Sequence, residues 1–222
     1  MKIKTLFLSL VLVAHYTSAQ TGVSSGLTIL KSFGIQKPYT GMHIGVEIPR
    51  DDEQSFFGRV TFTLKNKVDD SLISTAIDPT TTFPQQKYAD TRFGFSYLNF
   101  EGGTRYYIGS GYDFGWSAYG GTIFGVSISN ISRKTTDKDF DESKYEFVGS
   151  DNSPYPEKGR IIALNLGLNA GVKNHFVFGM LYFDVTLGYS ILALPSNNLA
   201  AEYNQFSQLM FSFNLGFRKD IF

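Results

Sequence analysis

Apolar and polar residues alternate strictly near the end of the chain, from residue 209 to residue 218. Large apolar side chains occupy the odd positions, while the even positions hold Met210 and then small or polar residues that end with Arg218. Alternation of this kind is typical of a β-strand whose two faces meet different environments. Because the apolar face is almost entirely Phe and Leu, the pattern predicts a membrane-spanning strand with lipid on one side and a polar lumen on the other.

Similar alternation recurs in earlier segments, which predicts an all-β fold. Most segments have about the 9 to 11 residues that a tilted strand needs to cross a bilayer. We expect them to form a closed antiparallel up-and-down transmembrane β-barrel, because an open edge would leave backbone groups unsatisfied in lipid. The eight expected strands are 41–48, 56–65, 90–100, 104–110, 116–129, 160–172, 176–191 and 209–218.

Two connections affect the strand count. Residues 101–103, Glu-Gly-Gly, are expected to form a tight hairpin turn, because glycine tolerates a positive φ. Residues 66–89 are expected to form a long loop, which would then lie on the periplasmic side, where loops are usually short. Either this connection is unusual, or segments 27–33 and 71–77 add two strands and the barrel has ten.

The N-terminus has the features of an export signal. Lys2 and Lys4 precede an apolar run at 6–14 that is too short to span a bilayer as a helix, and small residues at 17–19 mark a cleavage site. The chain is therefore expected to comprise a signal peptide at 1–20, a lead-in segment outside the barrel at 21–40, and the barrel at 41–222.

Composition narrows the classes of function. The chain of 222 residues has no cysteine, which excludes a disulfide framework and a thiol nucleophile. It carries 20 basic and 20 acidic side chains, so no overall positive field favours nucleic acid. The 34 Phe and Tyr residues (21 and 13) and 22 glycines, at near-neutral mean hydropathy, fit strands that are only half apolar.

Charged residues recur at positions expected to face the barrel interior. An unpaired buried charge is costly, so we expect these side chains to form a polar network of ion pairs and hydrogen bonds that fills the lumen. A gated proton or ion path is the alternative. The expected members of the network are His43, Glu47, Arg59, Lys65, Arg92, Arg105, Asp184 and Arg218.

A lipid-modifying enzyme embedded in the membrane is a further alternative. Such an enzyme needs a nucleophile within reach of a His base, and only His43 and His175 remain after the signal peptide. No local motif supports either residue, and no clustered ligand set indicates a metal. The acidic segment 137–142 lacks the calcium-loop spacing and is expected to be a solvated loop. We therefore expect no catalysis, no metal and no cofactor.

Three motifs resemble those of a known group. The Ser-Ala-Gln ending of the signal at 18–20, the hairpin motif FEGGTRYY at 100–107 and the aromatic last strand are similar to small outer-membrane β-barrel proteins of the PorT-like and OmpX-like kind. The resemblance covers 41–222. It implies insertion by the outer-membrane assembly machinery, which reads the last strand. The implied assembly signal is Phe211, Phe213, Leu215, Phe217 and Phe222.

The expected protein is an integral outer-membrane barrel of a Gram-negative-type cell, with a structural or protein-interaction role. Its expected partners are outer-membrane lipid, the assembly machinery, and envelope proteins that contact loops 130–158 and 193–204. A small-solute or ion channel and the lipid-modifying enzyme remain as alternatives. Because side chains nearly fill an eight-stranded barrel, we do not expect an open pore.

Overall fold

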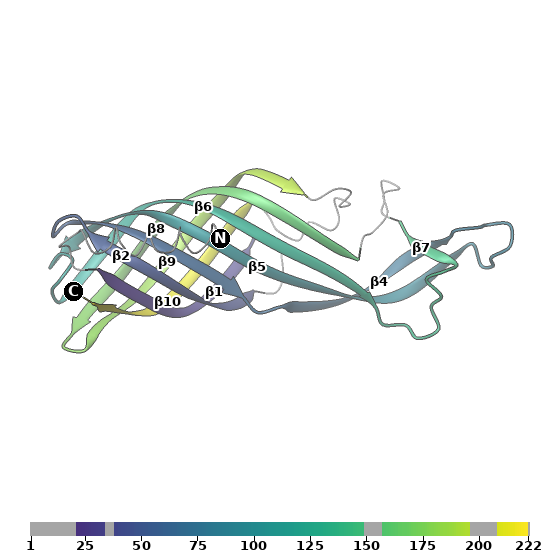
Figure 1. Cartoon of the computed structure of the whole chain (residues 1–222), viewed down its shortest axis with the longest axis horizontal. Coiled ribbons are helices and arrows are strands. Elements are labelled where there is room, and N and C mark those ends of the chain that lie inside the picture. The colour runs from purple at the N-terminus through teal and green to yellow at the C-terminus, as the bar shows by residue number, and fades with distance from the viewer. Residues whose placement is uncertain (1–20, 34–37, 149–156, 196–207, 222) are drawn as a thin grey trace, which may run out of the picture.

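The computed structural model describes residues 21–33, 38–148, 157–195 and 208–221. Eight strands form a closed antiparallel ring in the order β3, β2, β1, β10, β9, β8, β6, β5 and back to β3 (Figure 1). They are β1 (Gly22–Ser32), β2 (Tyr39–Pro49), β3 (Gln54–Thr63), β5 (Gln86–Gly109), β6 (Trp116–Thr135), β8 (Lys158–Phe176), β9 (Gly179–Pro195) and β10 (Leu209–Asp220). In the described part of the chain, no helix has the length and apolar character to cross a membrane. The expected eight-stranded up-and-down barrel is confirmed.

The segment at 21–40 does not lie outside the barrel, as the sequence had suggested. It forms β1, which pairs with β10 through Ile29 and Phe213 and with β2 through Leu27 and Met42. The strand was missed because its first half is a run of small residues without apolar alternation. The expected barrel boundary at residue 41 is therefore wrong, and the barrel begins at Gly22.

The hairpin expected at 101–103 is also absent, because β5 runs unbroken through it. The glycines there allow close approach of neighbouring strands, and a Cβ added at Gly103 would lie 1.9 Å from the backbone oxygen of Thr122. Two expected strands therefore merge into one. This loss offsets the gain of β1, so the count of eight holds although two of its members differ.

The two ends of the barrel differ in their connections. One end, the short-turn end, carries the turns at 50–53, 110–115 and 177–178. The described chain ends also meet there, where the backbone N–H of Ile221 donates to the oxygen of Thr21 at 2.9 Å. The opposite, long-loop end carries the connections that follow β1, β3, β6 and β9. All long connections thus lie at one end, as the loop-length rule requires.

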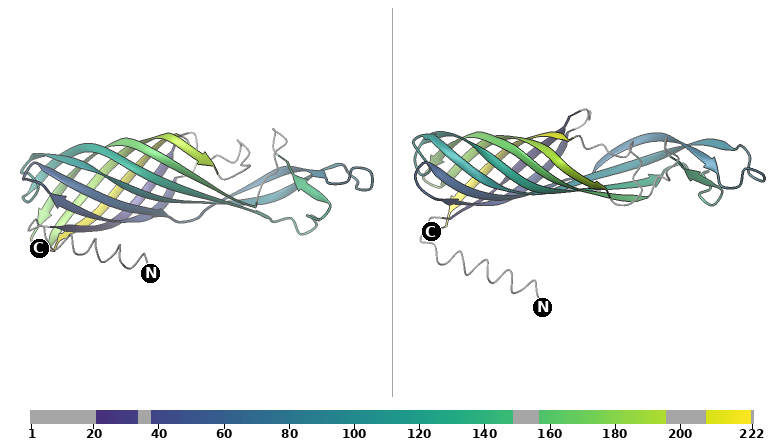
Figure 2. Two further views of the ribbon diagram at one scale, coloured as in Figure 1. Left: turned by 45° about the horizontal axis from the view of Figure 1, so that its top comes forward. Right: turned by 90° about the horizontal axis from the view of Figure 1, so that it is seen from above.

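A further sheet projects from the long-loop end (Figure 2). Here β4 (Asn66–Ala76) pairs with the first half of β5, and β7 (Tyr145–Phe147) pairs with β4. We call residues 66–95 and 131–147 the extension. The loop expected at 66–89 is therefore largely strand, and the strand suggested at 71–77 exists, but outside the ring. The sheet has ten strands and the barrel eight.

The barrel is inside-out compared with a water-soluble protein. Outward residues such as Ile44, Leu168 and Leu215 are apolar and more than half exposed (56%, 59% and 56%). In contrast, Arg218 and Asp184 are among the large side chains that are fully buried. An apolar exterior around a charged interior is the construction of a transmembrane barrel, in which lipid replaces the second packing layer.

Candidate functional site

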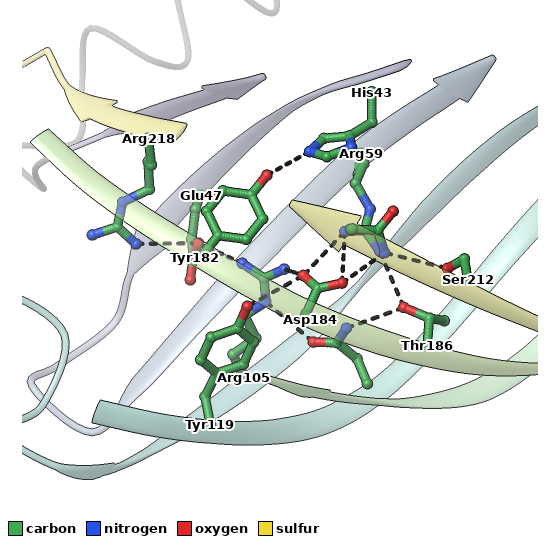
Figure 3. Close-up of polar contacts among 12 residues, drawn as sticks. His43, Glu47, Arg59, Arg105, Tyr119, Tyr182, Asp184, Thr186, Ser212 and Arg218 are labelled. Carbon is green, nitrogen blue, oxygen red and sulfur yellow. Dashed lines mark hydrogen bonds and ion pairs between the residues drawn. The ribbon is translucent and has the colours of Figure 1, made fainter. Parts of the chain in front are cut away.

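The ring encloses a set of ionisable side chains, which we call the lumen network; Figure 3 shows the part around Glu47 and Asp184. Each member occupies an inward position of its strand and is at most 8% exposed. The members are His43 and Glu47 on β2, Arg59 on β3, Glu101 and Arg105 on β5, Lys173 on β8, Asp184 on β9 and Arg218 on β10. Side chains from six of the eight barrel strands thus meet inside the lumen.

Asp184 lies at the centre of the network and binds two arginines at once. Arg59 Nη1 donates to both carboxylate oxygens at 3.1 Å, and Arg105 Nη2 donates to Oδ2 at 3.0 Å. Asn214 Nδ2 donates to Oδ1 at 2.7 Å and the Tyr119 hydroxyl to Oδ2 at 3.2 Å. Five hydrogen bonds from four strands therefore compensate one carboxylate that has no access to solvent.

Glu47 forms a second centre, nearer the short-turn end. Its carboxylate accepts hydrogen bonds from Arg105 Nη1 at 2.7 Å, from Ser55 Oγ at 2.5 Å and from the Tyr107 hydroxyl. Arg218 Nη1 lies 3.2 Å from Oε2, an ion pair without hydrogen-bond alignment. Arg105 therefore bridges the two carboxylate centres.

The remaining charges are paired in the same way. Glu101 binds Arg59 and accepts a hydrogen bond from Asn99 Nδ2 at 2.8 Å. The ammonium of Lys173 donates to the backbone oxygen of Tyr112, and the guanidinium of Arg218 lies 3.9 Å from the centroid of the Tyr112 ring. Charged groups are thus held by carboxylates, carbonyls or aromatic faces, which lowers the cost of their burial.

His43 binds polar groups on both sides of its ring. Nδ1 lies 2.8 Å from Thr28 Oγ1, and Nε2 lies 2.6 Å from the Tyr182 hydroxyl. The Thr28 hydroxyl also donates to Asn214 Oδ1 at 2.7 Å, which links His43 to the Asp184 centre. His175 lies on β8 at the short-turn end, where its backbone N–H donates to the oxygen of Gly115. His175 therefore lies near a turn at the end of the barrel, whereas the His43 side chain is buried in the lumen.

Six of the eight sequence-predicted network residues lie in the lumen, and Lys65 and Arg92 do not. Lys65 is exposed on the outer wall, and Arg92 lies in the extension, where its side chain pairs with Asp69. In the first half of β5 the alternation is opposite to the one expected for 90–100, because Phe93 and Phe95 point inward, whereas Arg105 in the second half points inward as expected. Arg92 therefore points outward.

Sequence reasoning also missed two charged members, Glu101 and Lys173. The sequence predicts a turn at 101–103 and a break between the strands 160–172 and 176–191, whereas β5 and β8 continue through these positions. Continuing the alternation from Arg105 back through the glycines would have placed Glu101 inward. The tyrosines at 107, 112 and 119, which form a buried aromatic cluster beside Glu47, were not assigned to the network.

Side chains fill most of the interior. One cavity in the lumen, lined in part by Tyr97, Asn165 and Met210, has a volume of about 30 Å³, which holds no more than a water or two. Towards the long-loop end the polar network gives way to a buried apolar cluster that includes Leu30, Tyr39 and Phe95. Within the described ranges, no group of three His, Asp or Glu side chains is arranged to hold a metal.

No protein-family model and no curated protein matches this sequence. Several solved structures are similar in their strand arrangement. Ail, the attachment invasion locus protein of Yersinia pestis, is 14% identical with a TM-score of 0.45, covering 91% of this chain and 100% of its own. Neisserial surface protein A (NspA) is 11% identical with a TM-score of 0.49, covering 92% and 98%. A major outer membrane protein from Thermus thermophilus is 13% identical with a TM-score of 0.46, covering 91% and 100%.

The physical construction of the barrel is the stronger evidence. Its ring leaves no open edge, its exterior is apolar where acyl chains would contact it, and its charges are compensated inside. These are the properties of outer-membrane-type barrels, and a bilayer is the environment in which such an exterior is stable. The chain is therefore an integral outer-membrane β-barrel protein.

Proposed function

We propose that this protein is a structural and protein-interaction component of the outer membrane that acts through its extension. The observation that carries the proposal is the contrast between a barrel filled with paired charges and a hydrogen-bonded sheet that continues beyond the barrel. A filled lumen disfavours the solute-channel alternative. The extension offers surface that the barrel itself does not need for spanning the bilayer.

The extension exposes several large apolar side chains among its charged ones. Ile73 and Tyr88 face each other across β4 and β5 and are 46% and 69% exposed. Ile77 and Phe83, near the tip, are 55% and 76% exposed. Directly opposed residues share one face of a sheet, so Ile73 and Tyr88 form a contiguous pair. Exposed apolar groups in water are typical of sites that contact a partner.

The connections favour one orientation in the membrane. Outer-membrane barrels have short periplasmic turns and longer external loops. By this rule the short-turn end and both described chain ends lie in the periplasm, and the extension lies outside the cell. The partner is then an envelope or surface protein. Of the two loops expected to contact partners, 130–158 contributes residues 131–147 to the extension. Residues 149–156 of this loop and 196–204 of the second loop lie outside the described residues.

The PorT-like and OmpX-like resemblance supports the same role and adds an assembly step. Phe213 and Leu215 are exposed on the outer face of β10, and Phe211 and Phe217 share their alternation. Phe222 lies outside the described residues. In the proposed function, the assembly machinery recognises this aromatic strand during insertion, and outer-membrane lipid then covers it.

The proposed role includes no catalysis. The polar atoms within hydrogen-bond distance of the His43 ring belong to Thr28 and Tyr182, and the Thr28 hydroxyl donates to Asn214. A general base needs an accessible nucleophile and a place for the substrate beside it. The His43 side chain is fully buried within a packed network, so it lacks both.

The interaction role can be tested by site-specific photocrosslinking in native membranes. A photoreactive residue in place of Tyr88 should give a discrete protein adduct. The same residue in place of Tyr106, which is exposed on the barrel wall near the short-turn end, is the matched control and should crosslink mainly to lipid. Absence of a protein adduct at Tyr88 would contradict the proposed surface.

Planar-bilayer recording tests the channel alternative, and steady openings of the purified barrel would refute the filled lumen.

A further inference from the structure

A basic hollow lies on the outer surface at the long-loop end, where the barrel meets the extension, separate from the lumen network. We call it the rim pocket, and its volume is about 440 Å³. The floor of the rim pocket consists of two rows of residues that are paired across β5, β6 and β8. The rows are Ser96, Asn130 and Arg160, and Gly94, Ser132 and Lys158.

The floor faces outward. The residues that alternate with it, including Phe95, Ile131 and Ile161, are buried on the inner side of the same strands. The floor therefore consists of small, hydrogen-bonding side chains on the surface that faces the membrane boundary. Neighbouring strands are about 4.8 Å apart, so the three strands give the floor a width of about 10 Å.

Positively charged side chains lie on both sides of this floor. Lys158 and Arg160 project from β8, and Lys65 reaches across β5 from the connection between β3 and β4. Arg160 is oriented by a hydrogen bond from Nε to Asn130 Oδ1 at 3.1 Å. No carboxylate in the described ranges forms an ion pair with Lys65 or Lys158.

Gly94 makes room for the Lys65 side chain. A Cβ added there would lie 2.0 Å from Lys65 Cε, 2.9 Å from Nζ and 2.9 Å from Ser132 Oγ. The Lys65 ammonium therefore lies over the glycine and close to the Ser132 hydroxyl. The Ser132 hydroxyl donates to the backbone oxygen of Gly94 at 3.3 Å. The ammonium and guanidinium groups around the hollow match the charge of a phosphate group.

The position of the pocket along the barrel identifies the kind of molecule that carries the phosphate. One step further along the same strands, the outward residues become apolar at Leu98, Ile128 and Ile162. They continue as Phe124 and Leu166, which are about half exposed (53% and 45%). A ligand seated in the pocket would therefore have its charged group among the cations and any acyl chains along the apolar wall.

We propose that the rim pocket binds the phosphate-bearing headgroup of a membrane lipid. The inference rests on the residence of the barrel in a membrane, but not on the interaction role of the extension. A basic cluster directly above an apolar wall fits an amphipathic anion better than a soluble one. Each cation near an anionic lipid surface contributes about a fivefold gain in affinity.

The test uses the full mature chain in a neutral sugar detergent, titrated with phosphatidic acid and followed by native mass spectrometry. Diacylglycerol with the same acyl chains and inorganic phosphate are the two comparison ligands. The principal variant is Lys65→Ser combined with Lys158→Ser, for which the affinity should fall about 30-fold. Its matched control, Lys138→Ser combined with Lys219→Ser, removes two exposed cations elsewhere and should change the affinity less than about threefold.

A second variant keeps the charge and changes only the shape. Gly94→Ala should displace the end of the Lys65 side chain and weaken binding about fivefold. The proposal is overturned if the two double variants bind phosphatidic acid equally, if diacylglycerol binds as well as phosphatidic acid, or if inorganic phosphate displaces the lipid at equal concentration. Should Gly94→Ala fail to fold, the lysine variants still decide the question. The crosslinking result at Tyr88 is independent of every one of these outcomes.

Discussion

Substitution of Asp184 by Asn tests whether the paired charges hold the barrel together. The change preserves shape but removes the charge that Arg59 and Arg105 share at 3.1 and 3.0 Å. Removing one partner of a buried ion pair typically costs about 3–5 kcal/mol, because the other charge is left uncompensated. Each arginine keeps a second carboxylate, Glu101 or Glu47, so we expect a loss near the lower limit, about 3 kcal/mol of unfolding free energy.

The assay is an equilibrium urea titration of the barrel in lipid vesicles, followed by the fluorescence of Trp116. This residue is the only tryptophan in the chain and is exposed on the outer wall. Asp69→Asn is the matched control, because it removes the partner of Arg92 in an exposed pair that contributes little. If Asp184→Asn shifts the unfolding midpoint no further than Asp69→Asn does, the network does not stabilise the barrel.

Three further predictions concern the wall and the extension. Leu166→Arg, on the lipid-facing side of β8, should cost about 2–4 kcal/mol in the same titration, whereas Leu166→Ile should be nearly silent. Gly103→Ala should prevent folding, because the added Cβ would collide with the Thr122 backbone oxygen. The readout is loss of the heat-modifiable band on a gel, and a normally folded variant would contradict the close approach of β5 and β6. Hydrogen bonds from the hydroxyl groups of Thr80 and Thr81 hold the pKa of Asp78, at the extension tip, at about 2. These bonds therefore stabilise the folded extension fully above pH 3.8, the ordinary pKa, and their contribution is lost as the pH falls through 2. Thr80→Val should raise that pKa in a carboxyl NMR titration, and an unchanged value would rule out the hydroxyl as its cause.

Some side chains have energetic roles that alternation does not reveal. Asn165 occupies a small, inward position in the pattern of β8, and nothing in the sequence distinguishes it from its neighbours. In the structure its amide donates to Ser127 Oγ at 3.0 Å and accepts from Ser190 Oγ at 2.7 Å. These partners come from β6 and β9, so their presence depends on which strands lie beside β8 and in which register.

The sequence by itself determined the fold class and the membrane environment. Alternation of apolar and polar residues is a local property of a strand, and it shows directly which face meets lipid. For the same reason, the sequence was sufficient to place residues such as Glu47, Asp184 and Arg218 on inward faces. Each of these lies within a strand whose alternation is uninterrupted over the membrane-spanning length.

Only the tertiary structure decided where strands begin, end and change environment. Gly102 and Gly103 fit a turn by local chemistry, but their role depends on the approach of β3 to Gly102 and of β6 to Gly103, and both strands are distant in sequence. The rule that apolar residues face outward also holds only within the bilayer. Beyond it the solvent is water, so Phe93 and Phe95 turn inward and Arg92 turns outward, because burial of apolar surface is favourable there. The position of each residue along the membrane normal is set by how all the strands of the ring pair. No single segment of the sequence holds that information.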